Sequence, residues 1–209
     1  MDCNDLIINT SENVYVPAED SYLIRDVVSE FIEKSDKTNL SVLDMGTGTG
    51  IIGICLATSI KIKKVILVDI NPEAVALSKS NINKNRKFIK AELLVEKSDL
   101  FSSIELQNFD VITFNPPYLP DEKNEDLMKE AFYGGWSGIE VAERFLIESK
   151  NYINKNSSIF MVASSLSDLS SLKKFVEINS FKITDERKIH IFFDSIKKRS
   201  ATSMPDQPP

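Results

Sequence analysis

The sequence predicts an α/β fold built on a doubly wound, mostly parallel seven-stranded sheet with one antiparallel strand. Short apolar segments alternate with helical patterns along the chain, as in strands that are joined by crossover helices. The last two apolar segments are too close together for a crossover helix, so one of them is expected to run antiparallel. The expected strands are 40–43, 65–68, 91–95, 109–114, 159–163, 181–185 and 189–196.

Five helices are expected around these strands. The first, over 17–34, has apolar residues at helical spacing and Pro17 in its first turn. Asn71 and Pro72 predict the N-cap and first position of a helix that runs to about residue 83. Ser137 and Glu140 match a capping box at the start of another helix. The remaining two helices are expected over 50–59 and 166–178.

Length and composition predict one globular domain. The chain has 209 residues, of which 42% are hydrophobic and 27% are charged. We expect a single domain over 1–199 and a disordered tail over 200–209, which is rich in Ser, Pro and Gln. No segment is apolar enough to cross a membrane, and the N-terminus lacks a secretory pattern. A cytoplasmic protein without a membrane partner is therefore expected.

The charge, histidine and cysteine contents argue against several classes of site. The net charge of −6 disfavours direct binding to nucleic acid. His190 is the only histidine, which argues against a metal site made by this chain alone and against Ser-His catalysis. Cys3 and Cys55 lack metal-ligand spacing. Cys55 lies in an apolar helical run, which predicts a buried, reduced thiol.

A glycine-rich turn follows the first expected strand, between Asp44 and Gly50. Glycines there allow a tight turn, let a ligand approach the backbone, and expose the first amides of the next helix. Gly48, Gly50 and Gly53 also match the G-x-G-x-x-G pattern of dinucleotide enzymes, and Asp69 lies near the expected distance for a ribose-binding acid. The turn therefore predicts a nucleotide-like ligand but leaves its identity open.

Three acidic residues follow three successive strands. Asp44, Asp69 and Asp99 are expected at the carboxyl edge of the sheet, where open α/β folds bind their ligands. Asp69 is suited to accept hydrogen bonds from two ribose hydroxyls, and Asp99 to accept one from an adenine amino group.

The segment from Asn115 to Tyr118, Asn-Pro-Pro-Tyr, follows the fourth expected strand. Its prolines stiffen the backbone, so that the Asn115 side-chain oxygen and the Pro116 carbonyl can both accept hydrogens from one planar NH2 group. The segment therefore predicts a site for an amide or an exocyclic amine. It begins a long loop, over 115–137, and such loops in compact domains are usually functional.

These segments resemble those of class I S-adenosylmethionine-dependent methyltransferases in the HemK-like glutamine methyltransferase family. The closest resemblance is to the short eukaryotic and archaeal branch that modifies class I translation release factors. The glycine turn is shared by the whole superfamily, and Asn-Pro-Pro-Tyr also occurs in enzymes that methylate amino groups of nucleic acids. The combination of Pro-Ala-Glu-Asp with Gly-Gly-x-x-Gly is narrower and selects the release-factor branch. The matching segments are 14–23, 44–50, 69–74, 115–120 and 131–141.

The resemblance implies a Rossmann-like enzyme that uses S-adenosylmethionine, releases S-adenosylhomocysteine and methylates the Gly-Gly-Gln glutamine amide of a class I release factor. It also implies a heterodimer with a small zinc-binding activator subunit. The implied catalytic residues are Asn115, Pro116 and Tyr118, and Pro117 joins them in binding the substrate. The implied cofactor-binding residues are Ser21, Asp44, Gly46, Gly48, Gly50, Asp69, Asn71, Asp99, Leu100 and Asn115.

Three alternatives stay open. The chain could methylate an adenine or guanine amino group in nucleic acid, since the Asn-Pro-Pro-Tyr chemistry is shared. It could be a non-catalytic, cofactor-binding scaffold subunit, or an NAD oxidoreductase, although the latter gives Asn115 no role. Two features depart from the release-factor branch: the bulky Trp136, and the segment 190–196, where an acid followed by aliphatic residues is usual.

Overall fold

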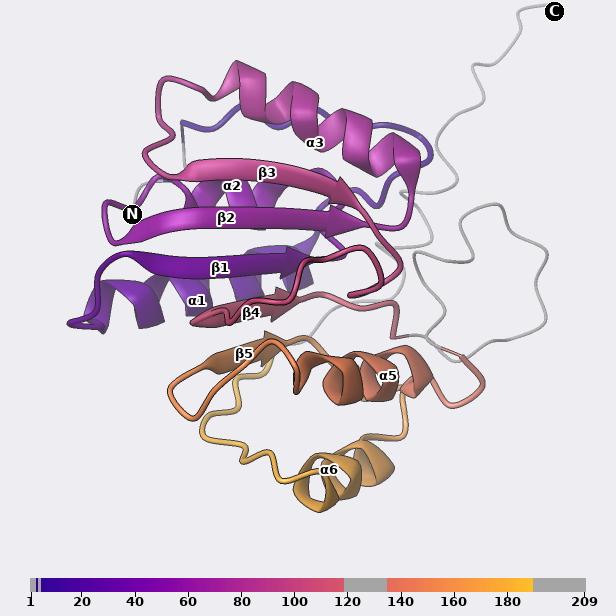
Figure 1. The fold of residues 1–209 in the computed structure, drawn as a ribbon. Coiled ribbons are helices and arrows are strands. Elements are labelled where there is room, and N and C mark those ends of the chain that lie inside the picture. The colour runs from indigo at the N-terminus through magenta and orange to yellow at the C-terminus, as the bar shows by residue number, and fades with distance from the viewer. Residues whose placement is uncertain (1–2, 4, 119–134, 190–209) are drawn as a thin grey trace, which may run out of the picture.

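The computed structural model describes residues 3, 5–118 and 135–189. In these residues five parallel strands form one sheet in the order β3-β2-β1-β4-β5 (Figure 1). The α/β class and the doubly wound, parallel arrangement are thus confirmed. The strands are β1 (Leu40–Met45), β2 (Ile62–Asp69), β3 (Glu92–Lys97), β4 (Val111–Phe114) and β5 (Ser158–Met161).

Helices cover both faces of the sheet, and side chains of each strand alternate between two apolar cores. One core contains Leu43 and Phe114 and packs against α5 and α6. The other contains Val42 and Leu67 and packs against α1, α2 and α3. In Figure 1, α1 and α2 lie behind the sheet. The helices are α1 (Glu19–Lys34), α2 (Ile51–Leu56), α3 (Pro72–Lys84), α5 (Glu140–Ser149) and α6 (Leu169–Ile178).

The structure confirms one of the predicted helix starts and corrects two. Asn71 caps α3, because its side-chain oxygen accepts a 2.9 Å hydrogen bond from the backbone N–H of Glu73. Pro17 lies before α1, which begins at Glu19. Ser137 does not cap α5. Instead its backbone N–H and its hydroxyl both donate to the Glu140 carboxylate, and the helix begins at Glu140 itself.

The predicted strand over 181–185 is wrong. A Schellman motif ends α6: Ser180 has φ 65°, its N–H donates to the Glu177 carbonyl, and the N–H of Phe181 donates to the Val176 carbonyl. The Phe181 ring then packs against the core beside α6, whereas residues 182–189 are exposed. The apolar residue that suggested a strand therefore closes a helix. The expected strand at 189–196, apart from residue 189, and the tail over 200–209 lie outside the described residues.

The N-terminal segment crosses α3 on its way to the carboxyl edge of the sheet. Asn81 of α3 and Asn85, the residue that caps the end of α3, bind the backbone of this segment as a neighbouring strand would. The Asn81 side chain accepts from the N–H of Asn9 and donates to its carbonyl, both at 3.0 Å. Asn85 makes the same pair of bonds to Ile7, at 2.9 and 2.8 Å. These contacts fix the path of a segment that has no regular structure of its own.

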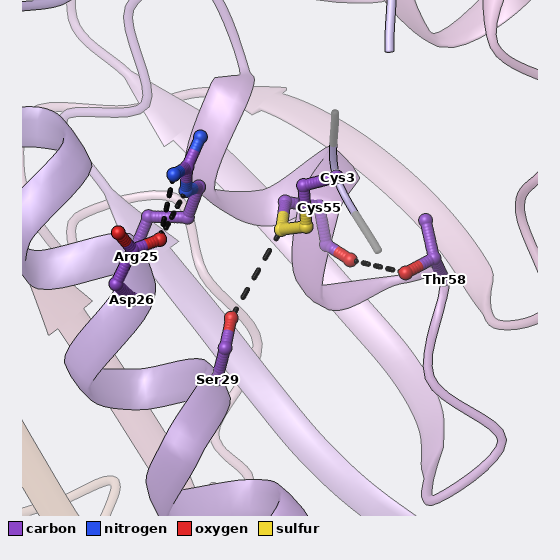
Figure 2. Close-up of a disulfide and its surroundings, with 6 residues drawn as sticks. All are labelled: Cys3, Arg25, Asp26, Ser29, Cys55 and Thr58. Atoms are coloured by element: carbon purple, nitrogen blue, oxygen red, sulfur yellow. Dashed lines mark hydrogen bonds and ion pairs between the residues drawn. A yellow bond between two sulfur atoms is a disulfide. The ribbon is translucent and has the colours of Figure 1, made fainter. Parts of the chain in front are cut away.

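Cys3 of the same segment forms a disulfide with Cys55 of α2, which corrects the prediction of a reduced thiol (Figure 2). Cys55 is fully buried in α2, and Ser29 of α1 approaches its sulfur. The two Cα atoms are 5.4 Å apart, within the usual range for a disulfide. The sequence could not show this pairing, because it depends on the route of the N-terminal segment across α3.

Neither a membrane-spanning helix nor a metal site is found in the described ranges. None of the helices there has the length and apolar character that crossing a membrane requires. Within residues 3, 5–118 and 135–189, no group of three or more His, Cys, Asp or Glu side chains is placed to hold a metal ion.

Candidate active site

The predicted site residues meet at the carboxyl edge of the sheet. The chain leaves β1, the central strand, at the glycine turn and leaves β4, its neighbour, at Asn115. The connections from β1 and β4 run to opposite faces of the sheet, so this edge is the topological switch point at which open α/β folds bind ligands. The first turn of α1 reaches the same place, because Asn115 contacts Asp20 and Ser21.

Asp44 lies beneath the glycine turn and is fully buried. Its carboxylate accepts hydrogen bonds from the Thr47 hydroxyl at 2.6 Å, the Gly53 N–H at 3.0 Å and the Thr113 hydroxyl at 2.7 Å. Burial raises the pKa of Asp44 to about 6, although the three donors favour its charged form. Through these hydrogen bonds the carboxylate joins the end of β1 to the glycine turn, to the first turn of α2 and to β4.

A glycine of the turn leaves room for a ligand, whereas a glycine of α2 leaves none. Gly48 has φ 56°, and a Cβ atom there would meet only the Val14 side chain, at 3.9 Å. A Cβ atom on Gly53 would lie 2.8 Å from the Leu67 Cγ atom. Gly48 therefore permits close approach to the backbone, whereas Gly53 permits close packing of α2 on β2. Gly46 and Gly50 also have positive φ, at 61° and 85°.

Asp69, at the end of β2, is bound to the same turn. It accepts from the N–H of Gly48 at 2.8 Å and from the N–H of Asn71 at 2.9 Å. Burial raises its pKa, while these backbone donors favour the charged form. Asn71 is occupied by its capping bond and by a 2.8 Å bond from its Nδ2 to the Asn13 carbonyl.

Asp99 and Leu100 follow β3, the strand next to β2 in the sheet. Asp99 is half exposed and forms an ion pair with Arg144 of α5. Leu100 is buried and has φ 45°, a conformation that few non-glycine residues adopt. The turn after β3 thus contains a residue with positive φ, and its aspartate is paired with an arginine.

Four polar side chains surround a buried carboxylate beside Asn115. Asp20, which is 1% exposed, accepts from the Tyr15 hydroxyl at 3.0 and 3.1 Å, the Tyr118 hydroxyl at 2.9 Å and the Asn115 Nδ2 at 3.0 Å. The Ser21 N–H donates to it at 2.7 Å, and the Ser21 hydroxyl at 3.3 Å. Burial and the Asp20 charge raise the pKa of Tyr15 and of Tyr118 well above their usual range, so both stay protonated donors.

One acceptor in this cluster has no donor. The Oδ1 atom of Asn115 is buried and has no hydrogen-bond partner among the described residues. Such an atom is costly unless a ligand satisfies it. Pro116 is buried and Pro117 is half-buried beside it, and the rest of the long loop, 119–134, lies outside the described residues.

Sequence reasoning missed Asp20 and Tyr15 as part of the site. The signal that could have found them is the segment 14–23 itself, which carries the family resemblance and contains both residues. It did not say which side chains would face Asn115.

The chain matches the model of the methyltransferase small domain over residues 25–191. A putative protein N5-glutamine methyltransferase of Methanocaldococcus jannaschii is 37% identical, over 88% of each chain. A release factor glutamine methyltransferase of Rhodopirellula baltica is 32% identical over 74% of this chain and 55% of its own length. The chain thus spans about half of that bacterial relative. The eRF1 methyltransferase catalytic subunit mtq2 of Schizosaccharomyces pombe is 26% identical, over 88% of this chain and 87% of its own.

The fold is also that of known methyltransferases. A ribosomal protein L11 methylase from Lactobacillus delbrueckii superposes with a TM-score of 0.64, covering 88% of this chain and 80% of its own, at 18% identity. At that identity the likeness concerns the fold alone. The family model and the archaeal relative carry the assignment, and the chain therefore belongs to the methyltransferase small domain family, among the HemK-like glutamine methyltransferases.

Proposed function

We propose that this chain transfers a methyl group from S-adenosylmethionine to the glutamine side-chain amide of the Gly-Gly-Gln segment of a class I release factor, in the cytoplasm. The observation that carries the proposal is the buried Oδ1 atom of Asn115, which has no partner among residues 3, 5–118 and 135–189 and can accept a hydrogen from a planar NH2 group. The printed names of the bacterial and fission yeast relatives support this acceptor.

The residues at the sheet edge fit a nucleoside cofactor. The open space at Gly48 admits a ligand to the backbone. The buried Thr49 hydroxyl oxygen lies in the same turn and also lacks a hydrogen-bond partner within the described ranges. When bound, S-adenosylmethionine supplies an electrophilic methyl group on a positive sulfonium. Asp69 would accept from its ribose hydroxyls and Asp99 from its adenine amino group. The other proposed cofactor residues are Ser21, Asp44, Gly46, Gly50, Asn71, Leu100 and Asn115.

Asn115 and Pro116 would orient the substrate and activate it. An amide nitrogen is a weak nucleophile because its lone pair is delocalised. When the Asn115 side-chain oxygen and the Pro116 carbonyl accept both of its hydrogens, electron density on the nitrogen rises as it attacks. Tyr118 and Pro117 would pack against the amide plane. Since the leaving thioether is neutral, the amide proton can leave after transfer, and no strong base is needed before it.

A small zinc-binding activator subunit is proposed as the partner in a heterodimer. The fission yeast relative is named as a catalytic subunit, which supports a second subunit for that protein. The test is to express the chain alone and with the candidate subunit and to compare yield, mass in solution and activity. A stable, fully active monomer would contradict this part of the proposal.

A methylation assay read by mass spectrometry tests the function. The purified protein, with and without the activator, receives S-adenosylmethionine and either a release factor containing Gly-Gly-Gln or its Gly-Gly-Asn variant. A gain of one methyl group on the glutamine, absent from the variant, is expected. Matched tRNA, rRNA and DNA serve as rival acceptors. If only nucleic acid is methylated, the amine chemistry stands and the proposed substrate does not.

A further inference from the structure

We infer that Asp20 is a positioning residue that fixes the direction of the Asn115 amide, with Nδ2 turned inward and Oδ1 turned toward the methyl acceptor. This inference rests on the proposed function. The Asp20 carboxylate accepts from Nδ2 of Asn115 at 3.0 Å, while Oδ1 of the same amide is buried and has no partner in the part of the chain that the structure describes.

The direction of that amide matters because its two ends have opposite chemistry. Oxygen and NH2 have nearly the same shape, so rotation by half a turn exchanges an acceptor for two donors. Only the orientation with Oδ1 outward can accept a hydrogen from a substrate NH2 group. With the amide reversed, its NH2 group would face the substrate NH2, and two donors would oppose each other.

A carboxylate selects the productive orientation. When ionised, Asp20 can only accept hydrogen bonds, so it attracts Nδ2 and repels Oδ1. Asp20 is 1% exposed, so bulk water does not replace the missing partner if the amide turns. The Ser21 hydroxyl also accepts from Nδ2, at 3.4 Å. Because its own hydrogen is directed to the Asp20 carboxylate at 3.3 Å, it supports the same direction of the amide.

The neighbouring groups keep this carboxylate in place. The Tyr15 hydroxyl and the Ser21 N–H donate to its Oδ1 atom, and the Tyr118 hydroxyl shares Oδ2 with Asn115. Asp20 also lies in the first turn of α1, where backbone amides stabilise negative charge. Since Tyr118 adjoins the substrate in the proposed mechanism, one carboxylate orders two residues of the Asn-Pro-Pro-Tyr segment.

The Asp20→Asn variant tests this role, because it keeps the size of the side chain and adds a donor. Its NH2 group can donate to Oδ1 of Asn115 and so stabilise the reversed amide. We expect kcat for release-factor methylation to fall by about 10-fold to 100-fold, as for loss of a transition-state hydrogen bond, with the Kd for S-adenosylmethionine within about twofold of the unchanged protein. Asp20→Glu, which remains acceptor-only, is expected to retain more activity than Asp20→Asn.

Asp26→Asn is the matched control, since Asp26 lies on the same helix with its side chain 64% exposed and bound to Arg25. It should leave kcat unchanged. A double-mutant cycle then separates positioning from general support. In the Asn115→Ala background, Asp20→Asn should cause a much smaller further loss, through Tyr118 alone, because there is no amide left to orient. A kcat for Asp20→Asn within twofold of the unchanged protein, or an equal additional loss in the Asn115→Ala background, would overturn the inference.

A measurement without turnover separates this inference from the proposed function. In nitrogen-15 spectra of the full chain, the Asn115 side-chain NH2 signal, identified by its loss in Asn115→Ala, should be protected from solvent exchange. Asp20→Asn should speed its exchange by at least about tenfold, and Asp26→Asn should not. Equal exchange in all three proteins would refute the positioning role even if the release factor is methylated. Altered exchange without any methylation of the release factor would refute only the proposed substrate.

Discussion

The hydroxyl of Thr113 donates a 2.7 Å hydrogen bond to the carboxylate of Asp44, and the two residues lie opposite each other in the paired strands β4 and β1. The bond joins the strands on either side of the topological switch point. Because Asp44 also accepts from Thr47 and Gly53, a single buried carboxylate connects both strands to the glycine turn. Its ionisation is therefore coupled to the stability of the fold.

Stability should depend on pH through Asp44. Burial raises its pKa from 3.8 to about 6, so between these values the folded state binds more protons than the unfolded state. The free energy of unfolding should thus fall, by up to about 3 kcal/mol, as the pH rises through this window. The Asp44→Asn variant should lack this dependence. It is measured by urea unfolding between pH 4 and 7, as the pH dependence of the difference in free energy of unfolding between the two proteins. His190 is common to both, so its titration cancels, and Asp26→Asn controls for loss of a carboxylate. Parallel pH curves for Asp44→Asn and the unchanged protein would contradict the assignment.

Asn115→Ala should separate binding from catalysis. The substitution removes the Oδ1 atom that would accept from the substrate but leaves the glycine turn and Asp69 intact, so the Kd for S-adenosylmethionine should change by less than a few-fold. Turnover should fall by about 100-fold, because a hydrogen bond that strengthens as the amide attacks is lost. Single-turnover kinetics with saturating release factor measures the chemical step directly. Unchanged turnover would remove Asn115 from the mechanism.

The sequence predicted those parts of the fold and site that depend on local pattern. The alternation of strands and helices, the Asn71 cap and the clustering of Asp44, Asp69 and Asn115 at one edge all follow from periodicity and strand direction. Contacts between distant segments did not follow. Asp20 and Asn115 are 95 positions apart, and nothing local says that the first turn of α1 faces the end of β4.

Two wrong predictions have the same origin. Phe181 fits a strand pattern, but tertiary packing against α6 uses it as the apolar residue that ends a helix. Cys55 fits a buried thiol, and burial is correct, but Asn81 of α3 and its C-cap Asn85 fix the path of the segment that brings Cys3 to it. In both cases the local pattern identified an apolar, inward-facing residue but not what it contacts, which is the core beside α6 for Phe181 and Cys3 for Cys55.

Alanine at two glycines should have different consequences. At Gly48 the new Cβ atom meets only Val14, at 3.9 Å, so the free energy of unfolding should fall by only about 1 to 2 kcal/mol, from the positive φ. Binding of S-adenosylmethionine should weaken by at least about tenfold, because the methyl group of the alanine occupies the open space.

At Gly53 the Cβ atom would lie 2.8 Å from Leu67 and 3.0 Å from the Asp44 carboxylate, so the free energy of unfolding should fall by about 1 to 3 kcal/mol. Titration calorimetry and urea unfolding measure the two effects, and equal loss of cofactor binding in both variants would argue against Gly48 as the contact.

The Cys3–Cys55 disulfide should stabilise the chain only under oxidising conditions. It closes a loop with a sequence separation of 52, for which the chain-entropy account gives about 4 kcal/mol of stabilisation. Cys3→Ser breaks the bond from its less buried end and leaves the fully buried Cys55 in place, so no cavity is created in α2. In urea unfolding without reductant, this variant should therefore be less stable than the unchanged protein by up to that amount.

With dithiothreitol the two proteins should unfold at the same urea concentration, since neither then carries the bond. A difference that persists in the reductant would mean that Cys3 contributes by packing, and equal stability without reductant would mean that the bond does not stabilise the fold.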